Sequence, residues 1–215
     1  MKKESFVHIV IAMLLTFCGG FCDAYTFITR GGVFASMQTG NLIKLFVNLI
    51  DKQTFEWMFF LPIIFFILGC VITVLSQKWK HEYILTMVLL FVSFLGCGFC
   101  PQNDAWNLVC VCILSVTGAM QFQAFRHCMD YYYTSTMCTN NMRLFSESIV
   151  ERNKGKILFY LSVIIIFSIG CVVGVVLSKE MGIYSLCPFS SIYLIVLIIE
   201  IIMRTKKREL ESQLA

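Results

Sequence analysis

The sequence contains little charge and few residues that interrupt helices. Only 14% of its 215 residues are Asp, Glu, Lys or Arg, only three are proline, and 58% are hydrophobic. The mean hydropathy is +0.79, and several apolar runs reach the roughly 20 residues that a helix needs to cross a bilayer. No stretch has the composition of a soluble domain. The sequence therefore predicts an all-α, polytopic transmembrane helix bundle, with residues 1–215 forming a single domain in a lipid bilayer.

The sequence also lacks the histidine and cysteine spacing of zinc sites. Its three histidines are scattered, and Cys97 and Cys100 form a C-x-x-C pair without the strand and helix pattern of a thioredoxin-like fold. The 11 cysteines are an odd number, which argues against a disulfide scaffold, and several lie in apolar runs where cysteine acts as a small hydrophobe. We therefore expect no metal and no cofactor.

Six segments are long and apolar enough to span a membrane. With six spans and both termini cytoplasmic, only four of the 17 Lys and Arg residues lie outside: Arg30, Lys44, Lys52 and Lys179. The remaining 13 lie on the cytoplasmic side, as the positive-inside rule requires. The net charge of +4 thus indicates topology, and we expect no nucleic-acid partner. The predicted spans are residues 6–29, 57–77, 83–100, 105–125, 156–178 and 184–203.

Two further segments, 33–50 and 133–150, are only partly apolar. Polar side chains interrupt the first of them, which indicates a broken or half-inserted helix. If both segments crossed the membrane, the chain would have eight spans, and Lys78 and Lys80 would move to the outer side against the charge rule. Six spans are therefore preferred, although the sequence leaves open whether these segments cross fully.

Asp23 is a carboxylate inside the first predicted span. Burying such a group in hydrocarbon costs a few kcal/mol even on lenient insertion scales, so it is normally kept for a task or a partner. The alternative is that Asp23 only snorkels or caps the following segment, because it lies late in its span. Its position makes residues 19–41 the first place to look for a site.

The chain repeats itself after 100 residues. Asp-Ala-Tyr at 23–25 lies over Gln-Ala-Phe at 123–125, and Ser-Met-Gln-Thr-Gly-Asn at 36–41 lies over Thr-Met-Cys-Thr-Asn-Asn at 136–141. Three spans per half is an odd number, so the two repeats, approximately 6–100 and 105–203, are expected to be inverted, as in many secondary transporters. The basic tail 204–215 would lie against anionic lipid in the cytoplasm.

Four motifs in combination resemble those of a known family. They are Gly-Phe-Cys-Asp-Ala at 20–24, Thr-Gly-Asn-Leu at 39–42, Met-Gln-Phe-Gln-Ala-Phe-Arg at 120–126 and Thr-Met-Cys-Thr at 136–139. The chain resembles the YoaK-type family, a set of bacterial inner-membrane proteins that carry a domain of unknown function. The resemblance implies a multi-pass protein of the bacterial cytoplasmic membrane and supplies no substrate. The chain departs from the family pattern at Asn140, where the second copy would carry glycine.

Polar residues of both copies form the predicted substrate or ion site, and no catalytic residue is proposed. Thr39, Gly40 and Asn41 can be explained as a helix N-cap and turn, or as an anion site at a helix N-terminus. Gln121 and Gln123 are two residues apart and cannot share one helical face. The candidate residues are Asp23, Gln38, Thr39, Gly40, Asn41, Gln121, Gln123, Arg126, Thr139, Asn140 and Asn141.

The inverted repeat predicts that the two breaks, 36–41 and 136–141, approach each other across one polar cavity that also contains Asp23 and Gln123. The alternative places both segments flat at opposite membrane surfaces. Arg126 is explained by the positive-inside rule, or less directly by a pairing with Asp23.

Two spacings predict contacts within the bundle. Gly170 and Gly174 form a small-xxx-small motif that suits helix packing, although such a motif also allows a homo-oligomer. Glu200 and Arg204 are four residues apart and are expected to form an ion pair.

Three classes of function fit these features. The favoured one is a small transporter or permease for a solute or ion, because of the repeat and the duplicated polar motifs. A membrane-embedded enzyme that uses Asp23 is the second, but no other acid, base or nucleophile stands in a matching motif. A structural or assembly protein is the third, and its polar motifs would face a partner.

Overall fold

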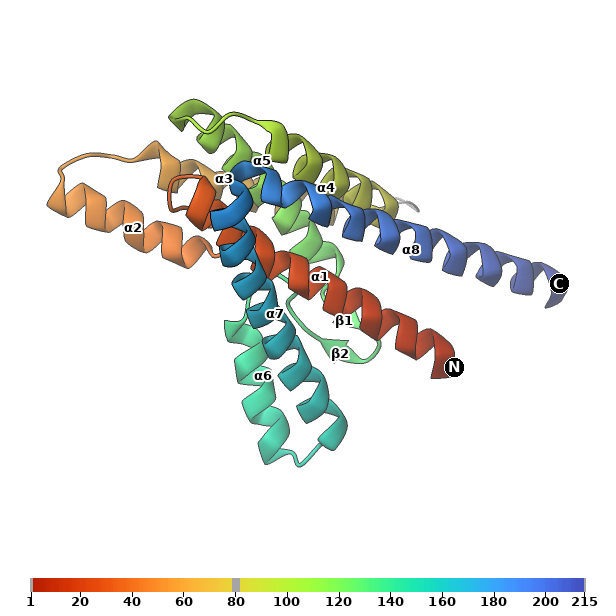
Figure 1. The fold of residues 1–215 in the computed structure, drawn as a ribbon. Helices are drawn as coiled ribbons and strands as arrows, with labels where there is room; N and C mark the ends of the chain where they lie inside the picture. Colours follow the sequence, from red (N-terminus) through yellow and green to blue (C-terminus); the bar gives the residue numbers. More distant parts are fainter. Residues whose placement is uncertain (1, 79–81, 215) are drawn as a thin grey trace.

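The computed structural model describes residues 2–78 and 82–214, and within them the chain is almost entirely helical. A short hairpin of β1 (His127–Cys128) and β2 (Tyr131–Tyr132) and a 3-10 turn, η1 (Gly182–Leu186), connect helices in the second half (Figure 1). The hairpin was not predicted. The α-helices are α1 (Lys2–Thr29), α2 (Gln38–Asp51), α3 (Trp57–Ser76), α4 (Glu82–Phe99), α5 (Asp104–Ala124), α6 (Thr139–Val150), α7 (Lys154–Met181) and α8 (Cys187–Leu214).

Five helical stretches in the described residues are long and apolar enough to cross a membrane. The longest, Lys154–Thr205, contains α7, η1 and α8 as far as Thr205, and the two helices run in different directions (Figure 1). A membrane-spanning helix bundle is therefore confirmed, whereas the six-span layout stays a prediction. The other four stretches are Phe6–Thr29, Trp57–Ser76, Glu82–Phe99 and Asp104–Ala124.

Long helices of the two halves pack against each other in pairs: α1 lies on α7, α3 on α5 and α4 on α8. Glycines allow the first two pairs to approach closely. A Cβ at Gly170 would lie 2.2 Å from Phe17 O, and one at Gly69 would lie 2.4 Å from Val116 O. Gly174 also faces the backbone of α1. The predicted packing role of Gly170 and Gly174 within the bundle is confirmed.

The helices α2 and α6 are too short to cross a bilayer alone. At about 1.5 Å per residue, their 14 and 12 residues span about 21 and 18 Å, against about 30 Å of hydrocarbon. Each packs on the long helix that follows it, and the two hairpins project from the bundle in different directions (Figure 1). The turn within each hairpin contains a residue with positive φ at an equivalent place, Gln53 between α2 and α3 and Arg152 between α6 and α7, both at 54°.

The helices α1 and α5 run in opposite directions. The end of α1 meets the start of α5, because Gln102 Nε2 donates to Thr29 O at 3.0 Å. At the other end, Ile11 of α1 and Ala124 of α5 line the same cavity. The first helices of the two halves are therefore antiparallel, and both polar breaks lie against this pair.

Candidate functional site

The first polar break, expected at 36–41, is in the structure the segment between α1 and α2. Ser36 is the point where this segment contacts both α1 and α5. The Ser36 N–H donates to Asp23 Oδ1 on α1 at 2.7 Å. On the other side, a Cβ at Gly118 of α5 would lie 3.1 Å from Ser36 Oγ, so the glycine leaves room for the loop. The turn that leads into this segment uses Gly31 and Gly32, whose φ values are 82° and 71° and suit glycine.

Asp23 is buried, with 2% of its surface exposed. Its Oδ2 accepts no hydrogen bond from any described residue. The carboxylate lies on a cavity of about 220 Å³ whose other lining side chains lack charge: Ala24, Phe27, Phe34, Met37, Cys171 and Val175. A buried carboxylate with one unpartnered oxygen is able to take up a proton or a cation.

A lysine stands beside the aromatic lining of this cavity. Lys44 Nζ lies 4.1 Å from the ring centroid of Phe27 and 4.9 Å from that of Phe34, and it donates to Gly32 O. Burial lowers the pKa of Lys44. The sequence placed Lys44 among the outer charges and gave no indication of this aromatic contact, because Phe27 and Phe34 belong to a different helix and loop.

The second polar break, expected at 136–141, is in the structure the loop of residues 133–138 before α6. The amide side chain of Gln121 holds this loop in place. Gln121 Nε2 donates to Ser135 Oγ at 3.1 Å and to Leu15 O at 3.0 Å, and Tyr193 OH donates to Gln121 Oε1 at 3.0 Å. Gly19 of α1 touches the same loop, where a Cβ would lie 2.3 Å from Ser135 O. This break therefore also contacts both α1 and α5.

The two breaks share one hydrogen-bond arrangement, made by Asn41 and Asn141. Asn41 Oδ1 accepts from Phe34 N at 2.9 Å and its Nδ2 donates to Phe34 O at 2.7 Å. Asn141 does the same with Thr134, at 3.0 and 2.7 Å. Both asparagines are fully buried. Each pins the backbone seven residues earlier, which closes the loop before its half-length helix.

The N-cap expected from Thr39 is wrong. Helix α2 begins at Gln38, and its N-cap residue Met37 makes no side-chain cap bond. Thr39 is exposed inside the first turn and Gly40 is half-buried there, with its Cα close to the Phe34 ring. The amide of Asn41 instead bonds the loop before the helix, at Phe34.

The remaining candidates of the two breaks differ in burial. Gln38 is half-buried and accepts from Asn41 Nδ2 at 2.8 Å. Thr139 is exposed, while Asn140 is half-buried and has a buried Nδ2 without a hydrogen-bond partner among the described residues. Gln123 is half-buried and does not line the Asp23 cavity.

The contacts of the two serines place the breaks at neighbouring levels. Ser36 contacts Asp23 on α1, and Ser135 lies against Gly19, which is one helical turn away, or about 6 Å along the axis. On α5, Gly118 lies against Ser36 and Gln121 bonds Ser135. The structure therefore brings Asp23, Asn41, Gln121 and their loops to the same helix pair.

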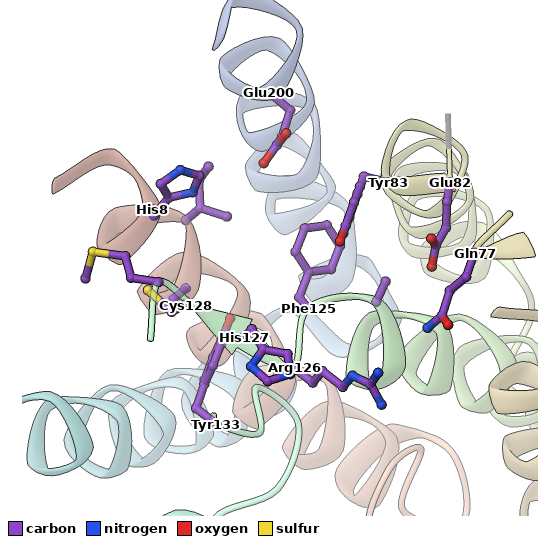
Figure 2. Close-up of a pocket in the computed structure, with 14 residues that line it drawn as sticks. His8, Gln77, Glu82, Tyr83, Phe125, Arg126, His127, Cys128, Tyr133 and Glu200 are labelled. Carbon is purple, nitrogen blue, oxygen red and sulfur yellow. The ribbon is translucent and has the colours of Figure 1, made fainter. Parts of the chain in front are cut away.

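A second cavity, of about 730 Å³, lies where the early part of α1, the start of α4, the end of α5 and the last part of α8 meet (Figure 2). Arg126 is exposed here, so the structure does not pair it with Asp23, whose carboxylate lies on the other cavity. The expected pair of Glu200 and Arg204 is confirmed at 3.6 Å. The polar side chains that line the cavity include His8, Gln77, Glu82, Tyr83, Arg126, His127, Tyr133 and Glu200.

Sequence reasoning missed this cavity because its polar residues come from the ends of several spans, where charges are ordinarily explained by topology. His8 and Glu200 lie near the inner ends of their predicted spans, and Glu82 directly precedes one. Of these residues, only Arg126 was a site candidate, and Glu200 was expected only to pair with Arg204.

Sequence reasoning also missed Arg30, which is fully buried at the end of α1. Its guanidinium donates to Cys97 O at 2.6 Å, Cys100 O at 3.1 Å and Pro101 O at 3.0 Å. It also donates to the Tyr25 hydroxyl and to Asn107 Oδ1. The first three acceptors are carbonyls in the last turn of α4 and in the two residues after it, at the negative end of the helix dipole. Arg30 thus fastens α1 to the turn between α4 and α5.

Comparisons with known proteins give a family and no activity. No curated protein and no solved structure matches the chain. A family model described as "Protein of unknown function (DUF1275)" matches residues 11–199, which is most of the chain. The chain therefore belongs to the DUF1275 family, in agreement with its resemblance to the YoaK-type proteins.

Proposed function

We propose that the protein is a small transporter or permease of the bacterial cytoplasmic membrane, with both termini cytoplasmic, that moves a small solute or ion. The observation that carries the proposal is Asp23. It lies in a span, is 2% exposed, and keeps Oδ2 without a hydrogen-bond partner in the described residues. A buried carboxylate whose oxygen accepts no hydrogen bond is costly unless it binds a proton, ion or solute during function.

The helix pairing supports an inverted repeat. Exchanging the two halves converts the α1–α7 pair into the α5–α3 pair, and it converts the α2–α3 hairpin into the α6–α7 hairpin. The antiparallel course of α1 and α5 is what a two-fold axis in the membrane plane requires. The identical bonds of Asn41 and Asn141 give the same relation at the level of single side chains.

The two breaks supply the polar groups for a solute or ion. Each half-length helix follows a buried loop, so the positive end of its dipole adjoins the bundle. In the proposed site, Asp23 takes up the proton or cation. Gln38, Asn41, Asn140 and Asn141 contact the solute once the loop bonds of the two buried asparagines open.

The ends of the molecule fit one state of an alternating-access cycle. The cavity of about 730 Å³ would be the cytoplasmic vestibule. The bonds among Gln121, Ser135 and Tyr193 would close its end toward the middle of the membrane. At the opposite end, the Arg30 bonds to the end of α4 would keep the outer side shut. Breaking and remaking those bonds would accompany movement of α1 and α7 against α3 and α5.

The two alternatives have less support. An enzyme that uses Asp23 needs a second acid, base or nucleophile, and among the described residues the Asp23 cavity offers only the thiol of Cys171. An assembly protein needs polar motifs that face outward, whereas Asn41 and Asn141 are buried and bond within their own loops.

The test uses purified protein in proteoliposomes on a solid-supported membrane. Currents are recorded after concentration jumps of H⁺, Na⁺ and K⁺, and after jumps of pooled amino acids, sugars and organic acids. The Asp23→Asn variant keeps the shape and removes the charge, so it should fold normally and lose most of the wild-type current. Asp104→Asn, at an exposed position, is the matched control and should keep it. Equal currents in wild type and Asp23→Asn, or none in the wild type, would contradict the proposal.

A further inference from the structure

The aromatic rings that border the Asp23 cavity also hold a positive charge. Phe27 and Phe34 line this cavity together with Asp23, and their rings are stacked with centroids 5.0 Å apart. Lys44 Nζ lies 4.1 and 4.9 Å from the two centroids, and Phe59 of α3 is a third ring at 5.8 Å. An ammonium group within about 6 Å of a ring centroid is attracted by the negative face of the ring. These rings therefore already stabilise one cation.

Asp23 places a negative charge beside the same rings. Asp23 and Phe27 are four residues apart on α1, so they share one helical face, with Cβ atoms about 5–6 Å apart. The carboxylate is buried, and its Oδ2 has no hydrogen-bond partner among the described residues. Lys44 does not fill this oxygen, because its Nζ donates to Gly32 O. The cavity therefore combines an unpartnered carboxylate oxygen with two aromatic rings.

The size and lining of the cavity select the kind of cation. Its volume of about 220 Å³ exceeds the roughly 30 Å³ of one water in the liquid and is below the roughly 300–1,000 Å³ of pockets for drug-sized ligands. Apart from Asp23, its lining side chains offer only carbon and sulfur atoms. A hard metal cation needs several oxygen ligands, whereas an ammonium ion with alkyl substituents matches one carboxylate in an apolar lining.

Access to the cavity also suits an apolar cation. Phe27 is 40% exposed and lies in the membrane-spanning stretch Phe6–Thr29, so its ring borders both the cavity and the outer surface of the bundle. Lipid chains cover that surface in a membrane. A ligand with apolar substituents is therefore able to approach Asp23 along Phe27.

We propose that the Asp23 cavity binds a small organic ammonium ion with apolar substituents, whose charge lies between the Asp23 carboxylate and the rings of Phe27 and Phe34. The inference rests on the proposed function, because it names the substrate class of the Asp23 site. Lys44 competes with the ligand, since its ammonium group occupies the same rings and repels a second cation beside them. Its flexible four-carbon stem allows it to leave the rings when the ligand enters.

The probe is radiolabelled tetraethylammonium, a cation with apolar substituents and no hydrogen-bond donor. Its binding to the full-length protein in lipid nanodiscs is measured by equilibrium dialysis, with empty nanodiscs as the blank. The wild type should bind the probe saturably. Asp23→Asn keeps the shape and removes the charge, so it should abolish saturable binding.

Two further variants separate the rings from the lysine. Phe27→Leu keeps an apolar side chain and removes a ring, so it should weaken binding about tenfold; Phe46→Leu, at an exposed ring of α2 outside the cavity, is the control. Lys44→Met keeps the stem and removes the competing charge, so it should strengthen binding severalfold. Lys52→Met, at an exposed position, is its control and should bind as the wild type does.

Strengthened binding in Lys44→Met sets a ligand site apart from rings that serve only to hold the lysine. Thermal unfolding establishes that each variant is folded, and the Phe27 and Lys44 variants decide the matter if Asp23→Asn is not. Saturable binding that Asp23→Asn abolishes, Phe27→Leu weakens and Lys44→Met strengthens supports the inference. No saturable binding to the wild type, equal binding in Asp23→Asn, equal effects of Phe27→Leu and Phe46→Leu, or unchanged or weaker binding in Lys44→Met would each overturn it.

Binding and transport are separate measurements, so the two proposals fail separately. Currents that need Asp23, without binding of tetraethylammonium, would overturn only the substrate class. Binding of tetraethylammonium without any current would overturn only the transport.

Discussion

The first and second polar breaks are closed by the same asparagine bonds, yet different groups are buried beside them. Asp23 meets Ser36 with a carboxylate that has one unpartnered oxygen, whereas Gln121 meets Ser135 with an amide that is bonded at both of its polar atoms. Closing the loop requires a side chain that donates and accepts at once, as asparagine does. The backbone geometry of the two breaks is therefore duplicated, while the group buried beside each differs in charge.

The half-length helices differ in the same way. Helix α2 exposes Ile43, Phe46 and Ile50, which suits contact with lipid chains. Helix α6 exposes Arg143 and Glu147 as an ion pair, which suits water or headgroups. The middle of α2 is therefore apolar on its exposed side, beside a half that buries a carboxylate, whereas the middle of α6 carries an exposed ion pair.

The largest expected effect is on the contact between α1 and the second break. A Cβ at Gly19 would lie 2.3 Å from Ser135 O, and backbone on both sides leaves little room to adjust. Gly19→Ala should lower the unfolding free energy by about 3 kcal/mol. Gly96→Ala is the control, since a Cβ there meets nothing within 4 Å. Unfolding in mixed micelles measures both, and equal stability of the two variants would show that the break does not press on α1.

The next effect separates two arginines, of which the sequence made only Arg126 a site candidate. Arg30→Gln removes bonds to three carbonyls at the end of α4 and leaves buried acceptors unsatisfied, so we expect a loss of about 2–3 kcal/mol. Arg126→Gln changes an exposed side chain and should cost less than about 0.5 kcal/mol. The same unfolding assay decides this, and a costly Arg126→Gln or a neutral Arg30→Gln would reverse our assignment of the buried clamp.

The smallest effect tests the likeness of the copies. Asn41→Ala and Asn141→Ala each remove two bonds to one backbone residue, and each should cost about 2 kcal/mol. Asn140→Ala is the control and should be nearly neutral, because Asn140 makes only long bonds to exposed Arg143. If only one of the two buried asparagines mattered, the copies would not be equivalent.

The sequence predicted the long helices well because each is a continuous apolar run. The predicted span 57–77 became α3, Trp57–Ser76, and 105–125 became α5, Asp104–Ala124. The segment 33–50 was recognised as half-polar, but its helix begins only at Gln38. The loop before it is shaped by Asn41 binding Phe34 seven residues back, and periodicity does not report such a bond.

The parts that could not be predicted depend on contacts between distant residues. Arg30 looks like a loop charge because its acceptors are backbone carbonyls 67 to 71 residues away. Gln123 aligns with Asp23 in the repeat, yet Gln121 is the residue that reaches its loop. The alignment identified the correct helix turn, and packing against α1 and Tyr193 selected the side chain.

The central claim, that the second half is an inverted copy of the first, is tested most directly by locating the two equivalent turns. A short epitope is inserted into the full-length protein after Gln53, between α2 and α3, or after Arg152, between α6 and α7; both sites are exposed turns with a φ of 54°. Antibody binding is compared in intact spheroplasts and in permeabilised cells. We predict that the epitope at Gln53 is labelled from outside and that the one at Arg152 is labelled only after permeabilisation. Labelling of both epitopes from the same side would contradict the inverted repeat.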